Sequence, residues 1–233
     1  MNSSFQYPQF YSREVAGAVL AALVSQRRFE ADVVVVGLVR GGIPVADKVA
    51  RQLKVAVFPL VVKKIGAPNN LELACGAIAS DGVIEWNESV CRQLGLSTSD
   101  RDSLARQARL GLEQKLEDFG WRPPIARDFR DKSVVIVDDG IATGASMRVA
   151  VKAVLRGNPR EICIAVPIAP EHIVRELASM PKCDVLCLHR VEDSEFGSVG
   201  QWYKDFTQVD TDACRSILSA RSEKNDFGAL HAP

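Results

Sequence analysis

The sequence lacks the features that mark several large classes of protein. Lys plus Arg and Asp plus Glu number 29 each, so no excess of one charge favours nucleic acid or a membrane surface. No apolar run reaches the roughly 20 residues that cross a bilayer, and the polar N-terminus shows no basic segment followed by an apolar one. We therefore expect no nucleic-acid partner, no membrane partner and a cytoplasmic location.

The six cysteines form no C-x-x-C pair. Cys183, Cys187 and His189 resemble a set of metal ligands, but in a strand the two cysteines would lie about 13 Å apart, too far to share an ion. A free Cys in an apolar run behaves as a small hydrophobic residue. We therefore expect no metal at these side chains.

Five short apolar runs, rich in β-branched residues, indicate strands that are buried on both faces. They span 32–38, 55–62, 134–137, 161–168 and 184–189. Helix-like segments at 12–28, 45–53, 147–155 and 171–178 alternate with them. This alternation predicts an α/β fold, a doubly wound, mainly parallel five-stranded sheet with helices on both faces. Pro59 places the second run toward an edge of the sheet.

The length of 233 residues and the hydrophobic content of 47% suit one domain with a sizeable core. We predict a single domain over 1–220, with a core of about 12–86 and 131–190. Residues 87–130, which contain a long amphipathic helix, are predicted to be a helical insertion. Residues 191–220 are predicted to form a small hood, and 221–233 a flexible tail.

The most informative stretch is SVVIVDDGIATGASMR, residues 133–148. A buried strand ends in Asp138 and Asp139, and small residues then lead into a helix. In open α/β sheets, ligands bind at the carboxyl ends of the strands. Backbone N–H groups of the small residues and of the helix N-terminus favour a phosphate. The residues expected to bind are Gly140, Ile141, Ala142, Thr143, Gly144, Ala145 and Ser146. Because carboxylates only accept hydrogen bonds, the two acids suit a sugar diol or a hydrated Mg²⁺.

Two other strand ends carry cations. Val39-Arg40-Gly41-Gly42 follows the first run, and a Gly-Gly turn before a helix makes a second anion site. Lys63 and Lys64 follow the second run and precede turn-forming residues, and they either serve the ligand or lie solvated on an edge.

The aromatic segment 191–206 follows the last predicted strand. It either stacks a flat base on Trp202, Tyr203 or Phe196, or only seals a hood over the sheet.

Other phosphate-binding motifs do not fit this sequence. A Walker A loop needs a Lys after its last glycine, and Gly140 to Gly144 has the wrong spacing. Gly37, Gly41 and Gly42 do not form the dinucleotide pattern G-x-G-x-x-G. A phosphatase of the haloacid dehalogenase type would carry Asp-x-Asp-Gly rather than Asp-Asp-Gly.

Residues 134–146 resemble, along their whole length, the 5-phosphoribosyl-1-pyrophosphate (PRPP) motif of type I phosphoribosyltransferases. The resemblance covers nearly the whole chain and includes Gly-Leu-x-Arg-Gly-Gly, Lys-x-Gly-Ala-Pro and Val-Gly-x-x-Tyr-x-Asp-Phe. It is greatest to a group of bacterial and archaeal phosphoribosyltransferases for which no acceptor is established.

The resemblance implies transfer of the ribose 5-phosphate group of PRPP to a nitrogen acceptor, usually a nucleobase, with release of pyrophosphate. It implies that the 39–42 turn holds pyrophosphate through backbone amides, with a cis peptide bond at Val39-Arg40. Arg40 and Lys63 or Lys64 would stabilise the leaving group, and the two lysines would open a mobile loop that extends through residue 72. Mg²⁺ is the implied cofactor, held by ligand oxygens with help from Asp138 and Asp139, directly or through water.

One residue departs from the pattern of the enzymes for 6-oxopurines, which carry an Asp where this chain has Ala142. The departure argues against hypoxanthine or guanine as acceptor. The family's frequent dimers imply a dimer. The competing hypotheses are a non-catalytic regulator that binds PRPP or a nucleotide, and a phosphatase or kinase that reuses the phosphate loop.

Overall fold

The computed structural model describes residues 9–68, 70–119 and 126–222. Its helices are α1 (Arg13–Val24), α2 (Gly42–Leu53), α3 (Glu88–Gln93), α4 (Thr98–Phe119), α5 (Ala145–Leu155), α6 (Glu171–Ala178) and α7 (Thr211–Ser222). Its strands are β1 (Val33–Leu38), β2 (Val57–Leu60), β3 (Val62–Ala67), β4 (Asn70–Ala79), β5 (Ile84–Trp86), β6 (Ser133–Val137), β7 (Glu161–Pro170) and β8 (Cys183–Val191). Short 3-10 helices span Ala126–Phe129 and Val199–Trp202.

The main sheet has five parallel strands in the order β2-β1-β6-β7-β8. The predicted doubly wound α/β fold is thereby confirmed. Every residue of β6 and β7 is buried, which explains why both read as continuous apolar runs. β2 lies at an edge, so Pro59 needs no hydrogen-bond partner on its open side.

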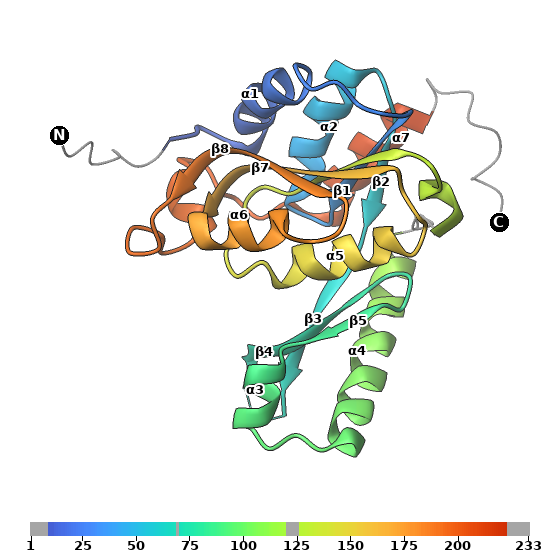
Figure 1. The fold of residues 1–233 in the computed structure, drawn as a ribbon, viewed down its shortest axis with the longest axis vertical. Helices are drawn as coiled ribbons and strands as arrows, with labels where there is room; N and C mark the ends of the chain where they lie inside the picture. The colour runs from blue at the N-terminus through green and yellow to red at the C-terminus, as the bar shows by residue number, and fades with distance from the viewer. Residues whose placement is uncertain (1–8, 69, 120–125, 223–233) are drawn as a thin grey trace.

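Helices cover both faces of this sheet (Figure 1). Val135 and Val137 of β6 point to a core with residues of α1, α2 and α7, while Val134 and Ile136 point to one with residues of α5 and α6. This alternation is expected, because successive side chains of a strand point to opposite faces of the sheet. The carboxyl ends of the strands are left for the connecting loops.

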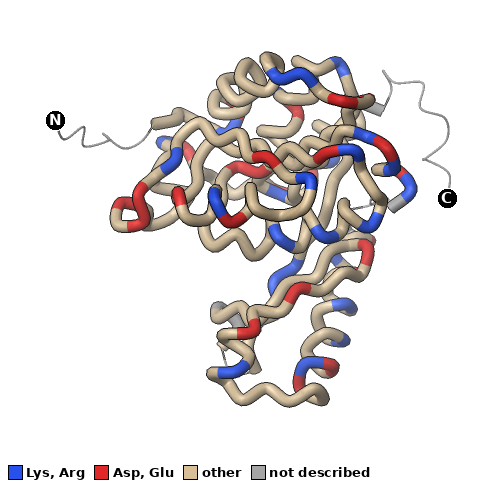
Figure 2. The backbone as a smooth tube through the Cα atoms, in the orientation of Figure 1, with Lys and Arg blue, Asp and Glu red and all other residues tan. Residues whose placement is uncertain are grey.

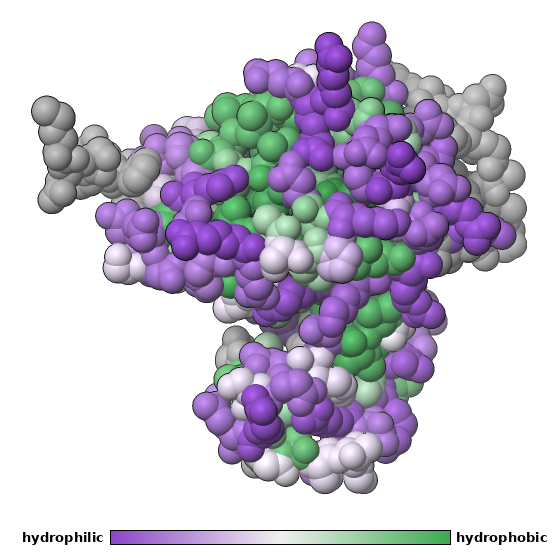
Figure 3. Space-filling view, viewed as in Figure 1, coloured by the Kyte–Doolittle hydropathy of each residue, from purple (hydrophilic) through white to green (hydrophobic). Residues whose placement is uncertain are grey.

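A second, antiparallel sheet of β3, β4 and β5 carries α3 and α4, and we call this unit the projecting lobe. It extends from the main body, and the molecule narrows between the two (Figures 1 and 3). Its core joins Ile65 and Cys75 of the sheet to Cys91 of α3 and to Ala108 and Leu112 of α4.

The projecting lobe corrects two predictions. It begins at β3, so the insertion includes residues 62–86, which the sequence pattern assigns to the core. The predicted loop from Lys63 is instead largely β3, paired with β4 through Val62 opposite Ala79 and Ile65 opposite Gly76. The two lysines pair with Ile78 and Ala77, which come after the turn of this hairpin, so the local pattern around the lysines does not indicate the strand.

The hood is fastened to the N-terminal segment. Phe10 donates its backbone N–H to the carbonyl of Trp202 at 2.9 Å and accepts from Lys204 at 2.8 Å. Trp202 has an exposed fraction of 0% and packs with Phe10, Ile168 and Tyr203. The prediction that Trp202 stacks on a ligand base is therefore wrong, because neither face of its ring is accessible. The other interpretation, an aromatic seal, describes Trp202 and Tyr203.

Within the described residues, no helix combines the length and apolar character needed to cross a membrane. Most of the predicted tail, 223–233, and part of the predicted insertion, 120–125, lie outside those residues.

Candidate functional site

A cavity of about 160 Å³ lies where β6 ends and α5 begins. It is lined by Lys64, Asp138, Gly140, Ile141, Ala142, Thr143, Gly144, Ala145, Ser146, Met147 and Val199. All seven residues predicted to cradle a phosphate thus surround one space, together with one of the two acids and one of the two lysines. Met147 and Val199 were missed, although Val199 begins the Val-Gly-x-x-Tyr motif.

Two glycines give the 140–146 loop its shape. A side chain on Gly140 would come within 2.6 Å of Val199 and 2.7 Å of Ile168, so only glycine fits there. Gly144 has φ +73, a left-handed conformation that glycine adopts without strain, and it precedes the first turn of α5. In the described part of the chain no side chain caps this helix, so its first N–H groups remain free for an anion.

The two acids differ in their surroundings. Arg13 of α1 donates from Nε to Oδ2 of Asp139 at 2.6 Å, and the exposed fractions of the two side chains are only 9% and 13%. Tyr203 donates from its hydroxyl to the backbone carbonyl of Asp139 at 2.5 Å. Arg13 also donates to the carbonyl of Thr207 at 2.8 Å and lies 3.8 Å from the ring centre of Phe206. Asp139 therefore connects α1 to the hood through Arg13 and Tyr203, and the positive charge of Arg13 balances its negative charge.

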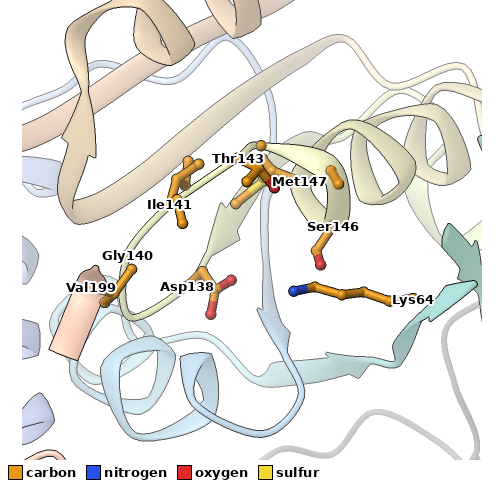
Figure 4. Close-up of a pocket in the computed structure, with 11 residues that line it drawn as sticks. Lys64, Asp138, Gly140, Ile141, Thr143, Ser146, Met147 and Val199 are labelled. Atoms are coloured by element: carbon orange, nitrogen blue, oxygen red, sulfur yellow. The ribbon is translucent and has the colours of Figure 1, made fainter. Parts of the chain in front are cut away.

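Asp138 instead lines the cavity (Figure 4). Within the described residues no ion pair joins its carboxylate to a cation, and its Oδ1 accepts from the backbone of Asp139 at 2.9 Å. Burial, followed by the neighbouring Asp139 charge, raises the pKa of Asp138 well above its ordinary value. Burial also raises the pKa of Asp139, against the opposing effect of Arg13. Of the two acids, Asp138 is the one that can meet a ligand.

The two lysines point to opposite sides of β3, as neighbours on a strand must. Lys64 directs its ammonium group into the space between Asp138 and Ser146 (Figure 4). Lys63 lies against α4, where a side chain on Gly111 would overlap its Nζ. Of the two lysines, Lys64 is the one that lines the cavity, and which of them faces a pyrophosphate stays a prediction.

The 39–42 turn lies beside the acids. The Val39-Arg40 peptide bond is cis, as the family resemblance implied. A side chain on Gly41 would overlap the Asp139 carboxylate, and one on Gly42 would come within 2.7 Å of the carbonyl of Val137. Arg40 is not among the residues that line the cavity. Its role, and that of Lys63, at a leaving pyrophosphate stay predictions.

A family model described as "Phosphoribosyl transferase domain" matches residues 9–197. Two curated relatives from strains of Mycobacterium tuberculosis, named "Putative phosphoribosyl transferase" Rv0571c and MT0597, are each 38% identical over 227 residues, 96% of this chain. The chain spans about half of their length, 49%.

Among solved structures, that of TT1426 from Thermus thermophilus is similar to this fold, with a TM-score of 0.74 and 36% identity. The match covers 91% of this chain and 99% of that one. With a family model matching most of its length, the chain belongs to the phosphoribosyl transferase domain family.

Proposed function

We propose that the protein transfers the ribose 5-phosphate group of PRPP to a nitrogen acceptor, a nucleobase other than a 6-oxopurine, and releases pyrophosphate. One observation above all supports this: the 140–146 loop surrounds a cavity that also receives Asp138 and Lys64. A phosphate cradle, an acid for a diol and a cation for a leaving group are the three parts that this reaction requires.

The 5-phosphate would lie in the loop. The free N–H groups at the start of α5 and the hydroxyls of Thr143 and Ser146 are donors suited to its oxygens. The ribose diol would then lie over Asp138. Because Asp139 is paired with Arg13, the acid pair presents about one negative charge rather than two to the ligand. The arrangement reduces the repulsion between the acids and the phosphates.

The reaction itself needs no protein nucleophile. The bond between C1 of the ribose and the pyrophosphate oxygen breaks, and pyrophosphate leaves with the electron pair. The acceptor nitrogen forms the new bond to C1 and loses its proton. Lys64 already lies at the cavity before the ligand binds, and it would stabilise the charge that develops on the leaving group. One such contact typically increases the rate about 10²–10³-fold.

The residues at the cavity could hold Mg²⁺ only if the ligand supplies most of the coordinating oxygens. The described residues hold no cluster of three or more His, Cys, Asp or Glu side chains suited to a metal, so ligand oxygens must supply most of its coordination. Asp138 is a hard oxygen donor beside the cavity and would hold the ion directly or through water. When bound, Mg²⁺ would neutralise charge on the pyrophosphate oxygens.

The test is a panel of nucleobases and amines with PRPP and Mg²⁺, with pyrophosphate release as the readout. We expect turnover with at least one acceptor and a loss of about 10²–10³ in rate for Lys64→Gln. Lys204→Gln, which removes an exposed lysine of the hood, is the matched control and should leave the rate within about twofold. Equal rates for the two variants would remove Lys64 from the reaction.

A second candidate is a regulator that binds PRPP or a nucleotide without turnover. The burial of Trp202 favours it, since the aromatic ring expected to hold the acceptor base is not available. Tight binding of PRPP by calorimetry, with no pyrophosphate released for any acceptor, would decide for this candidate.

A further inference from the structure

The sheet of the projecting lobe has a helix against each face, α4 on one side and α5 on the other. Lys63 of β3 lies against α4 at Gly111, and its neighbour Lys64 points the other way, into the cavity beside α5. Lys64 pairs with Ala77 of β4, and Ala77 pairs with Glu85 of β5. Side chains directly opposite one another on neighbouring strands share one face of the sheet. Lys64, Ala77 and Glu85 therefore form one row across the three strands, on the face toward α5.

The side of α5 that begins at Ser146 lies along this row. Ser146 lines the cavity together with Lys64, and Lys152, six residues further on, forms an ion pair with Glu85. Six residues rise about 9 Å along an α-helix. Lys64 and Glu85 are two strand spacings apart, which is also about 9–10 Å. The row thus runs along α5, with Lys64 at the end that carries the phosphate loop and Glu85 further toward the C-terminus.

The contact between β4 and α5 is apolar and made of small side chains. Val149 and Ala153 of α5 pack with Ala77 and Ala79 of β4, and all four are at most 2% exposed. Large and small side chains that alternate across a contact interdigitate and fix its geometry, whereas a contact of Ala and Val alone is nearly flat. This contact therefore buries apolar surface without fixing the position of the sheet along the helix.

Ion pairs supply the direction that the apolar contact lacks. The exposed fractions of Lys152 and Glu85 are 44% and 29%, so the pair lies at the edge of the contact. Arg156, at the C-terminal end of α5, pairs at 3.9 Å with Asp81 in the turn between β4 and β5. Figure 2 shows basic positions on α5 and acidic positions on the sheet of the lobe beside it. Charge pairs across a contact contribute more to its register than to its strength.

We propose that Glu85 and Lys152 are positioning residues, whose ion pair holds the projecting lobe on α5 so that Lys64 reaches the cavity. Lys64 and Glu85 belong to one row of a hydrogen-bonded sheet, so a shift of Glu85 along α5 moves Lys64 with it. A catalytic group that is misplaced by about 1 Å can lower the rate about 10²-fold. The inference rests on the proposed function, which assigns Lys64 to the leaving group.

Reversal of each charge tests the pair. Glu85→Lys and Lys152→Glu both place like charges together, and each should slow the release of pyrophosphate from PRPP about tenfold. One variant adds positive charge and the other removes it, so a change in the electric field alone would alter the rate in opposite directions. The double variant restores an ion pair and should bring the rate back to within about threefold of the natural protein.

Lys132→Glu is the matched control. Lys132 also pairs with an acid, Asp32 at 2.9 Å, but this pair lies at the amino ends of β6 and β1, whereas the cavity lies at the carboxyl end of β6. The rate of this variant should stay within about twofold of that of the natural protein.

The same reversals in a Lys64→Gln protein show whether the pair acts through Lys64. There each reversal should change the remaining rate less than about twofold, because the group to be positioned is gone. Three results would overturn the inference: single reversals as fast as Lys132→Glu, a double variant as slow as the single ones, or the full loss of rate in the Lys64→Gln protein.

Calorimetry of the full chain with inorganic phosphate separates this inference from the proposed function. If no acceptor supports turnover, the proposed function fails, and the affinity for phosphate becomes the readout. Lys64→Gln should weaken phosphate binding, and both charge reversals should weaken it only where Lys64 is present. Equal affinities of the natural protein and the two reversals, or no binding of phosphate to the natural protein, would overturn the positioning of Lys64 independently of turnover.

Discussion

Replacing Arg13 by Met should destabilise the protein more than any surface charge substitution. Arg13 and Asp139 form a buried pair with an N–O distance of 2.6 Å, and Met keeps most of the volume of Arg while removing its charge. The substitution leaves the Asp139 carboxylate buried without a cation. It also removes the hydrogen bond to the carbonyl of Thr207 and the contact with the ring of Phe206.

The expected size follows from these contacts. Removing one partner of a buried ion pair costs about 3–5 kcal/mol, which includes the penalty of the stranded charge. For a chain of this length, each kcal/mol lowers Tm by about 2–4 °C, so Tm should fall by roughly 6–20 °C. The hydrogen bond to Thr207 has a charged donor, and bonds of that kind contribute about 1.5–3 kcal/mol, so the upper part of this range is expected.

The pH dependence has a definite sign. In the variant, the pKa of Asp139 in the folded state lies further above its unfolded value, because burial still raises it and Arg13 no longer opposes that shift. A raised carboxyl pKa means that the folded state binds more protons, so stability falls as pH rises through that window. The difference in stability between the natural protein and Arg13→Met should therefore be smaller at pH 5 than at pH 8.

Urea unfolding followed by circular dichroism at the two pH values measures both effects. Arg160→Met is the matched control, because Arg160 also pairs through Nε, at 3.0 Å with Glu30, but both side chains are more than half exposed. Its cost should lie below about 1 kcal/mol. If Arg13→Met costs no more than Arg160→Met, or if its cost is larger at pH 5, then Asp139 is not held as an ion pair and both acids are free for a ligand.

Three further predictions concern the site and the hood. Asp138→Asn should raise the Tm of the ligand-free protein at pH 8 but not near pH 4. The pKa of Asp138 is higher in the folded than in the unfolded protein, so its carboxylate destabilises the fold only at pH values above the unfolded pKa. An equal Tm of the two proteins at pH 8 would contradict this. Gly144→Ala should lower stability by at least about 1–2 kcal/mol in urea unfolding and weaken phosphate binding, because alanine at φ +73 is strained and its Cβ would lie 2.8 Å from Arg148 and 3.1 Å from Ile173. Gly82→Ala, at φ +86 in open space, carries only the backbone strain of about 1–2 kcal/mol and should leave binding unchanged; unchanged phosphate binding in Gly144→Ala would contradict the role of the loop. Trp202→Ala should lower the free energy of unfolding by about 3–5 kcal/mol, since the ring is fully buried. Calorimetry of the folded variant should give an unchanged PRPP affinity. A large loss of affinity would show that Trp202 contacts the ligand.

What could be predicted from the sequence was the part set by local pattern. The apolar runs of β6 and β7 are buried on both faces, and that burial leaves a continuous hydrophobic stretch in the sequence. The 140–146 loop was predicted residue by residue, because its small residues directly follow the strand and directly precede the helix. Pro59 was correctly assigned to an edge strand for the same local reason.

What could not be predicted depended on partners outside the local pattern, most of them distant in the chain. Arg13 and Asp139 are 126 positions apart, and nothing near either residue indicates their pairing. The directions of Lys63 and Lys64 follow from β3, whose existence depends on its pairing with β4. Trp202 was assigned to the ligand because it follows the last strand, yet Phe10 and Ile168, both distant from it in the sequence, enclose its ring.

The most direct test of the account is a crystal structure of the protein with PRPP and Mg²⁺. We predict the 5-phosphate in the 140–146 loop, within hydrogen-bond distance of the backbone N–H groups at the start of α5. The ribose diol should contact Asp138, with Arg13 still paired to Asp139. A PRPP molecule bound elsewhere, with that loop empty, would contradict the assignment of the site and of the function drawn from it.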